Sequence, residues 1–417
     1  MGGGARLRWS RLVLFLSVMG PGIITGNVDN DANGIATYSI AGASYGYKIL
    51  WTLVLSTLSL AVVQEMGARL GAVTGKGLAA LIRERFRVRL TLFAMVVLVL
   101  ANWANTVGDF AGVAGALEIF GISRYITIPI TVFLVIAFLL WGSYRSVERV
   151  FLVACLLYVT YVISAVLAKP PWGEVIKASF TPSFEFDAPY ITMVIGVVGT
   201  TIAPWMQFYQ QSAVVDKGIR VEELSYTRID TYLGALSTNV VAFFIVVACA
   251  ATLFIHQVTI NNAQDAAVAL APLAGKYASL LFALGLLNGA LFSVAIIPLS
   301  TAYAVCEAFG WEAGMNRNFR EAPVFVGLYA GLIITAALVI LFPGVPLVPV
   351  MFFSQVLNGI LLPVVLIFML LLINDERIVG PYRNSAILNA VAWITVIAMI
   401  ILSLLLVVTT AMGVGVS

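Results

Sequence analysis

The sequence predicts an all-helical protein that crosses a membrane many times. Of its 417 residues, 61% are apolar and only 10% are charged, and the mean hydropathy is +1.02. Soluble domains average roughly 45–50% apolar and 25% charged residues, so a soluble fold is excluded. The net charge of +3 is too small for a nucleic-acid-binding surface. We expect a membrane protein with short loops and no nucleic-acid partner.

Apolar runs separated by charged residues or by Pro and Gly define the predicted spans. A helix that crosses a bilayer needs about 20 mostly apolar residues. Eleven runs meet this requirement, at residues 11–46, 48–72, 90–120, 124–141, 148–168, 188–214, 226–256, 277–308, 322–342, 346–374 and 386–412.

The distribution of Lys and Arg predicts the orientation in the membrane. Eighteen of these 23 residues fall in the N-terminal region and in the even-numbered connections. The other five are Lys48, Arg124, Lys169, Lys177 and Lys276. Because cytoplasmic loops carry the excess of positive charge, we expect a cytoplasmic N-terminus and an extracytoplasmic C-terminus. The plasma membrane is the expected location, with membrane lipids as surroundings.

Two of the predicted spans contain polar residues and helix breakers at membrane depth. The first holds Asn27-Val28-Asp29-Asn30-Asp31-Ala32-Asn33-Gly34, and the sixth holds Gly196, Gly199, Thr200, Thr201 and Pro204. Buried acids and amides are costly in a bilayer and normally face a cavity, a partner or an ion. Interrupted helices five spans apart are typical of inverted repeats that bind substrate near the midplane. We divide the chain into a tail (1–10), a first five-helix repeat (11–170), an inverted second repeat (171–375) and an eleventh helix with the C-terminus (376–417).

Several short motifs occur in the order found in the Nramp family of divalent-metal transporters, which the chain resembles over nearly its whole length. They are Gly20-Pro21-Gly22, Asp31, Ala36-Thr37, Gly46-Tyr47-Lys48, Gln64, Ala68-Arg69-Leu70-Gly71, Val73-Thr74-Gly75, Leu167-Ala168-Lys169-Pro170, Ile229-Asp230, Ser354-Gln355 and Pro363. The resemblance implies a LeuT-like fold of two inverted repeats plus an extra helix. It implies a transporter, with no cofactor and no obligate protein partner. The residues themselves contain no P-loop or Ser/His/Asp pattern that would indicate an enzyme.

Departures from the family pattern fall at the positions that the resemblance assigns to metal and proton. The family motif Asp-Pro-Gly-Asn reads Asp31-Ala32-Asn33-Gly34 here. Ala203 stands where the family has a methionine, Trp205 where it has a histidine, and Gly112 where it has a glutamate. An arginine of the ninth helix has no counterpart. This combination resembles the Nramp-related magnesium transporters, a branch of the family.

The loss of the thioether favours hard cations. Carboxylate, amide and carbonyl oxygens suit Mg²⁺ and Mn²⁺, whereas sulfur selects softer metals. Mg²⁺ also keeps several of its waters, and we expect the small residues Ala203 and Gly34 to leave room for them. The sequence therefore predicts Mg²⁺ uptake, with Mn²⁺ also carried, through a partly hydrated ion near the membrane midplane.

The predicted metal ligands come from the two interrupted helices and from the tenth span. They are Asp31, Asn33, Thr200, the carbonyl of Ala203, and Gln355. Residues expected around the site or along the access path are Gly34, Asp29, Trp205, Asn358, Asp109 and Asp230.

Few residues could carry a co-transported proton. His256 is the only histidine and lies near the predicted outer end of the seventh span. Since histidine is the side chain that titrates near neutral pH, we expect transport without proton coupling. The alternatives are a proton-coupled transition-metal transporter, a carrier of Al³⁺, and a sodium-coupled symporter of organic solutes.

Overall fold

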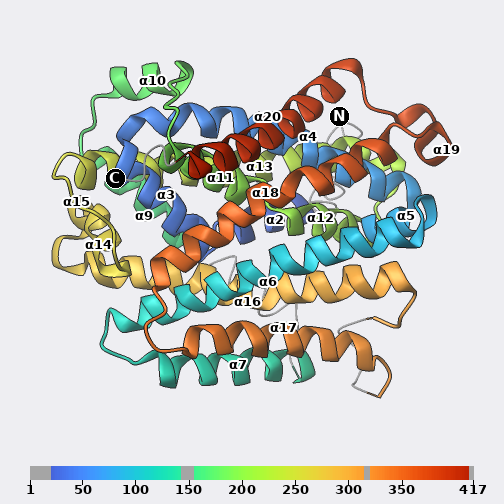
Figure 1. Cartoon of the computed structure of the whole chain (residues 1–417), viewed down its shortest axis with the longest axis horizontal. Helices are drawn as coiled ribbons and strands as arrows, with labels where there is room; N and C mark the ends of the chain where they lie inside the picture. The colour runs from blue at the N-terminus through green and yellow to red at the C-terminus, as the bar shows by residue number, and fades with distance from the viewer. Residues whose placement is uncertain (1–19, 142–154, 314–319, 413–417) are drawn as a thin grey trace, which may run out of the picture.

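The computed structural model describes residues 20–141, 155–313 and 320–412, and within these ranges the chain forms helices and turns without a strand (Figure 1). The long helices are α2 (Pro21–Asp29), α3 (Ala32–Tyr45), α4 (Leu50–Thr74), α6 (Val88–Glu118), α7 (Arg124–Trp141), α9 (Val159–Leu167), α11 (Ala188–Thr201), α12 (Pro204–Asp216), α13 (Leu224–Cys249), α16 (Ala278–Phe309), α17 (Pro323–Leu341), α18 (Leu347–Ile373) and α20 (Ala386–Ala411). Short helices lie in the connections: α5 (Leu78–Arg85), α10 (Trp172–Phe180), α14 (Ala263–Ala267), α15 (Ala271–Ala274) and α19 (Glu376–Val379).

Each of the eleven predicted spans contains helix in the described part of the chain. Among the described residues, eight helices are long and apolar enough to cross a membrane, and shorter apolar helices occupy Arg124–Ala137 and Leu156–Leu167. The predicted tail 1–10, the start of the first span and residues 148–154 of the fifth lie outside the described residues. The prediction of an all-helical membrane fold is confirmed.

Both predicted interruptions are present. Between α2 and α3, Asn30 and Asp31 have non-helical backbone angles, and the Asp31 carboxylate caps α3 by accepting the Gly34 N–H at 2.6 Å. Between α11 and α12, Ile202 and Ala203 are non-helical. Pro204 then begins α12, where its missing N–H costs no helical bond.

The interrupted helices lie in the middle of the molecule. Figure 1 shows α6, α7, α16 and α17 running side by side in the lower part of the view, and these four helices all contact one another. Helix α3 contacts α6 and α16 of this group and also α11, α13 and α18. Glycines let α2 approach α13 closely, since a Cβ on Gly26 would lie 2.6 Å from the Gly234 carbonyl oxygen. The break in α2–α3 is therefore enclosed by helices on all of these sides.

The short connecting helices gather at two opposite ends of the molecule. Helices α5 and α19 lie at one end and α10, α14 and α15 at the other (Figure 1). Arg83 and Arg85 of α5 thus share an end with Arg377 of α19, as the predicted alternation of loops requires. The assignment of this end to the cytoplasm stays a prediction.

Candidate metal-binding site

Two buried carboxylates face each other across shared hydrogen-bond donors. Asp31 lies at the break before α3 and is 3% exposed, and Asp109 of α6 is fully buried. The Asn33 amide nitrogen donates to Asp31 Oδ2 at 3.2 Å and to Asp109 Oδ1 at 2.9 Å. Ser293 Oγ of α16 donates to Asp109 Oδ2 at 2.5 Å and lies 3.5 Å from Asp31 Oδ2. Asp109, predicted on the access path, thus belongs to the same cluster as Asp31.

A ring of amides extends this cluster to α18. Asn105 lies one helical turn before Asp109, and its Oδ1 accepts from Gln355 Nε2 at 2.5 Å and from Asn358 Nδ2 at 3.2 Å. Its Nδ2 points to Asp31 Oδ2 at 3.4 Å. The Asn358 amide also donates to Gln355 Oε1 at 2.9 Å. The predicted site residues Gln355 and Asn358 are therefore connected to Asp31 through Asn105.

Small residues on α3 and α6 allow these side chains to approach. A Cβ on Gly108 would collide with the Asn33 side chain, so glycine at this position admits the Asn33 amide between the two carboxylates. A Cβ on Gly34 would lie 3.0 Å from the Asp29 carbonyl oxygen, 3.1 Å from Thr200 Oγ1 and 3.3 Å from Asp31 Oδ1. The expectation that Gly34 provides extra room is wrong, because its surroundings are already filled. Gly34 instead allows the Thr200 side chain of α11 to pack against the start of α3.

The Ala203 carbonyl, at the break in the sixth span, has two hydrogen-bond donors. The Ala203 carbonyl accepts from Met206 N at 3.2 Å and from Gln207 Nε2 at 3.3 Å. A cation bound to this carbonyl would replace the Gln207 contact. Trp205 is 1% exposed and packs against Tyr209, with ring centroids 5.8 Å apart.

The other two predicted acids have different surroundings. Asp230 of α13 accepts the backbone N–H groups of Gly20 at 3.0 Å and Gly22 at 2.7 Å. It caps the first turn of α2, where backbone donors are otherwise unpaired. Asp29 is buried at the end of α2, two residues before Asp31, and the structure contains no direct hydrogen bond between the two among the described contacts. A structural role therefore accounts for the burial of Asp230.

A family model described as "Natural resistance-associated macrophage protein-like" (Nramp) matches residues 22–409. The chain belongs to the Nramp family. This places it among membrane transporters of divalent metals.

Solved structures of two transporters are similar in fold to this chain. A manganese transporter of Eremococcus coleocola, in complex with an aromatic bis-isothiourea compound, is 21% identical with a TM-score of 0.74 over 93% of this chain and 85% of that one. Mhp1, a nucleobase-cation-symport-1 family transporter, in a closed conformation, is 16% identical with a TM-score of 0.59 over 95% of this chain and 91% of that one. These likenesses show the fold, including the LeuT-like arrangement predicted from the sequence.

Gly112 stands where the Nramp pattern has a glutamate, and its α6 backbone packs directly against Ala32 of α3. A Cβ on Gly112 would collide with the Ala32 methyl group and would lie 3.6 Å from the Met351 sulfur. A glutamate therefore has no room beside α3 in this arrangement. The same contact brings one thioether, that of Met351 in α18, to the turn of α6 that follows Asp109.

Within the described residues no three His, Cys, Asp or Glu side chains form a metal-binding group. The polar cluster instead contains the carboxylates of Asp31 and Asp109, several amides and the Ser293 hydroxyl. Asn105 and Ser293 were not predicted from the sequence. Asn105 could have been found from its spacing, since residues four apart share one helix face with Asp109.

Proposed function

We propose that this Nramp protein takes up Mg²⁺, and also Mn²⁺, by alternating access through the cluster around Asp31. The observation that carries the proposal is the pair of buried carboxylates, Asp31 and Asp109, bridged by Asn33 and Ser293. In the described part of the chain neither acid has a lysine or arginine as a hydrogen-bond partner, so the two acids are proposed to provide the negative charge that a buried dication needs. Amide and hydroxyl oxygens complete a hard donor set.

The ion is proposed to remain partly hydrated. Mg²⁺ gives up its waters reluctantly and is commonly held by only one or two carboxylates. Asp31 and Asp109 fit this number, and Asn105, Gln355 and Asn358 are placed to hydrogen-bond the retained waters. Thr200 and the Ala203 carbonyl are proposed to contact the ion from the second interrupted helix.

Membrane potential alone supplies a sufficient driving force. An inside-negative potential contributes about 2.3 kcal/mol per charge per 100 mV, hence about 4.6 kcal/mol for a dication. Trp205 and Gly112 replace the family's histidine and glutamate. His256 is exposed and contacts the carbonyl oxygen of Thr252, one turn earlier. We therefore propose uptake that is not coupled to protons.

The decisive experiment is metal flux into proteoliposomes with an internal pH indicator. We expect Mg²⁺ influx without acidification, and its loss in Asp31→Asn. The matched control is Asp187→Asn, which removes a carboxylate that caps α11 through Tyr190 N, away from the cluster. Acidification in step with Mg²⁺ would refute uncoupled transport, and normal flux in Asp31→Asn would refute the site.

A second candidate is transport of softer transition metals. The Met351 sulfur near Gly112 favours it, because a thioether is a soft donor. Competition by Mn²⁺, Zn²⁺ and Ca²⁺ against Mg²⁺ flux separates the two. If Zn²⁺ blocks Mg²⁺ flux at concentrations far below that of Mg²⁺, and is itself transported, a soft-metal transporter replaces the Mg²⁺ transporter as the proposed function.

A further inference from the structure

A large open cavity lies at the end of the molecule where α5 and α19 are found, and it shares no residue with the metal site. Its volume is about 1150 Å³. Its walls come from α5, from the last turn of α18, from α19 and from the first turns of α20. The lining residues used below are Arg85, Leu371, Arg377, Arg383 and Trp393.

The cavity opens beside surfaces that face lipid. Helix α20 lies at the periphery of the bundle, and most of its apolar stretch is not buried by other helices. Leu371, Trp393 and Ile394 are 48%, 38% and 66% exposed, although each lies in a predicted span. Large exposed apolar side chains on such helices indicate lipid contact, and tryptophan is enriched at the level of lipid headgroups. Trp393 in the cavity wall is therefore expected at headgroup height, near the ends of α18 and α20.

The charges in the cavity favour an anion. Three arginines line it, and two acids lie among them. Asp375 pairs with Arg85 at 2.5 Å and Glu376 with Arg383 at 3.4 Å, which leaves one net positive charge. The backbone N–H of Arg377, with help from the Arg85 guanidinium, holds the pKa of Asp375 below its usual range, so this carboxylate is ionised at neutral pH. One net positive charge balances the single negative charge of a phosphodiester. A guanidinium group can also donate two hydrogen bonds to two oxygens of one phosphate.

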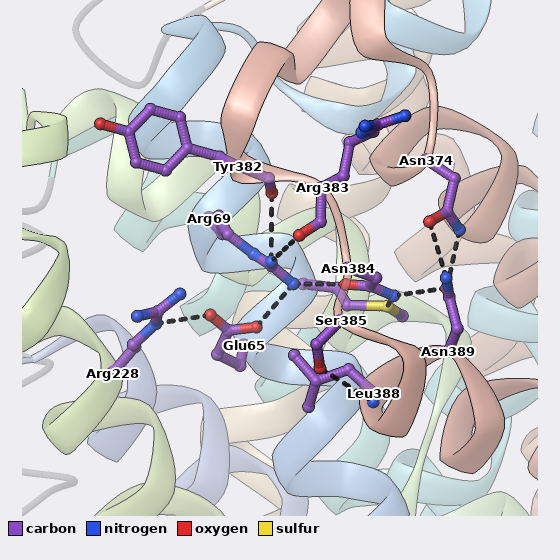
Figure 2. A network of polar contacts seen from close by, with 11 residues as sticks. Glu65, Arg69, Arg228, Asn374, Tyr382, Arg383, Asn384, Ser385, Leu388 and Asn389 are labelled. Atoms are coloured by element: carbon purple, nitrogen blue, oxygen red, sulfur yellow. Dashed lines mark hydrogen bonds and ion pairs between the residues drawn. The ribbon is translucent and has the colours of Figure 1, made fainter.

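A buried polar network fixes the wall that carries Arg383. Arg69 of α4 is 2% exposed and donates to the carbonyls of Tyr382 at 3.1 Å and Arg383 at 3.0 Å, and to the Asn384 side chain. Figure 2 shows the Arg383 guanidinium directed away from Arg69 while its carbonyl faces it.

Further contacts hold the two helix ends and Arg69 itself. Asn374 at the end of α18 and Asn389 of α20 donate to each other at 2.8 and 2.9 Å. Glu65 lies 2.9 Å from Arg69 and accepts from Arg228 of α13 at 2.7 Å (Figure 2). The cavity is thus formed before any ligand binds.

We propose that this cavity binds the phosphate headgroup of an anionic phospholipid. Arg377 and Arg383 contact the phosphate, while Leu371 and Trp393 pack on the glycerol and upper acyl chains. A soluble phosphate ester shares the headgroup chemistry but gains nothing from these apolar side chains. A lipid of the same leaflet is also concentrated at the height expected for Trp393, where anionic lipids attract basic residues.

Native mass spectrometry of the full chain in neutral detergent tests this proposal. The probes are phosphatidylglycerol and phosphatidylcholine, with sn-glycerol 3-phosphate and inorganic phosphate as soluble competitors. The test variant is Arg377→Gln/Arg383→Gln. The control variant is Arg87→Gln/Arg89→Gln, which removes two exposed arginines outside the cavity. If the double variant in the cavity is unstable, the single variant Arg377→Gln replaces it as the test variant, because Arg377 is exposed.

We expect one phosphatidylglycerol to be retained by the parent protein and by the control, in preference to phosphatidylcholine. The cavity variant should bind it about tenfold more weakly, as the loss of a charged hydrogen bond predicts. Equal weakening in both variants would overturn the proposal in favour of general surface charge. Displacement of the lipid by equimolar glycerol phosphate or phosphate would overturn it in favour of a soluble anion.

Discussion

Replacing Asn33 by leucine should destabilise the metal-free protein and make its stability depend more steeply on Mg²⁺. The Asn33 amide nitrogen donates to both carboxylates, at 3.2 Å to Asp31 and at 2.9 Å to Asp109. A hydrogen bond to a charged group contributes roughly 1.5–3 kcal/mol, so the loss of both costs roughly 3–6 kcal/mol. Leucine is close in size but removes the whole amide: the nitrogen, which also contacts the Asn105 carbonyl oxygen at 3.0 Å, and the oxygen, which has no hydrogen-bond partner among the described residues. A bound dication supplies the missing positive charge, so Mg²⁺ should recover much of the loss.

Thermal unfolding of the purified protein, with and without saturating Mg²⁺, measures this effect. Asn102→Leu is the matched control, because Asn102 is equally buried on α6 but donates to the neutral Thr301 hydroxyl at 2.7 Å. We expect it to lose roughly 0.5–1.5 kcal/mol with no change in the response to Mg²⁺. An Asn33 variant with normal metal-free stability and a weaker response to Mg²⁺ would refute the reasoning. Asn33 would then act mainly as an oxygen ligand.

Three further substitutions probe the site and the network in Figure 2. Asp109→Asn should keep the fold but reduce Mg²⁺ flux by about tenfold or more, because one of two carboxylates for the ion is lost; unchanged flux would remove Asp109 from the site. Ala203→Met should lower Mg²⁺ flux more than Mn²⁺ flux in the proteoliposome assay, since it adds volume and a soft donor. An equal effect on both ions would contradict this. Glu65→Gln should destabilise the protein by about 3–5 kcal/mol, because the buried Arg69 loses its counter-charge. Glu84→Gln, at an exposed pair with Lys76, should cost less than about 1 kcal/mol in the same unfolding measurement, and similar losses would refute the role of Glu65.

The fold could be predicted from the sequence because its main features are local. Apolar runs of the length of a bilayer identify the spans without knowledge of their neighbours. The break at Asp31 follows from an acidic cap before a helix, and the break at Ala203 follows from Pro204. The short helices in the connections, such as α5 and α19, were not predicted, since they do not carry the apolar pattern of a span.

The site could be predicted only in part, because its contacts join distant segments. Asp31 and Asn33 were identifiable as polar residues in an apolar run. That Asp109 shares donors with Asp31 depends on how closely α6 approaches α3, which Gly108 and Gly112 determine. Ser293 is one hydroxyl in a long apolar helix, and nothing in its neighbourhood marks it as a partner of Asp109. The close packing around Gly34 was likewise inaccessible, since it requires the position of Thr200 on another helix.

The return of the empty carrier determines whether this transporter needs protons. A buried carboxylate must be neutralised or satisfied by donors when the cation has left. Here Asn33 and Ser293 donate to Asp31 and Asp109, and Asn105 adds a further amide. We propose that these neutral donors stabilise the empty site without a proton, as uncoupled transport requires. If internal acidification accompanied each Mg²⁺, the donors would be insufficient and the carboxylate pair itself would carry the proton. The Asn33→Leu variant tests this directly. Because it lacks the main donor to both carboxylates, its empty carrier should take up protons when it returns.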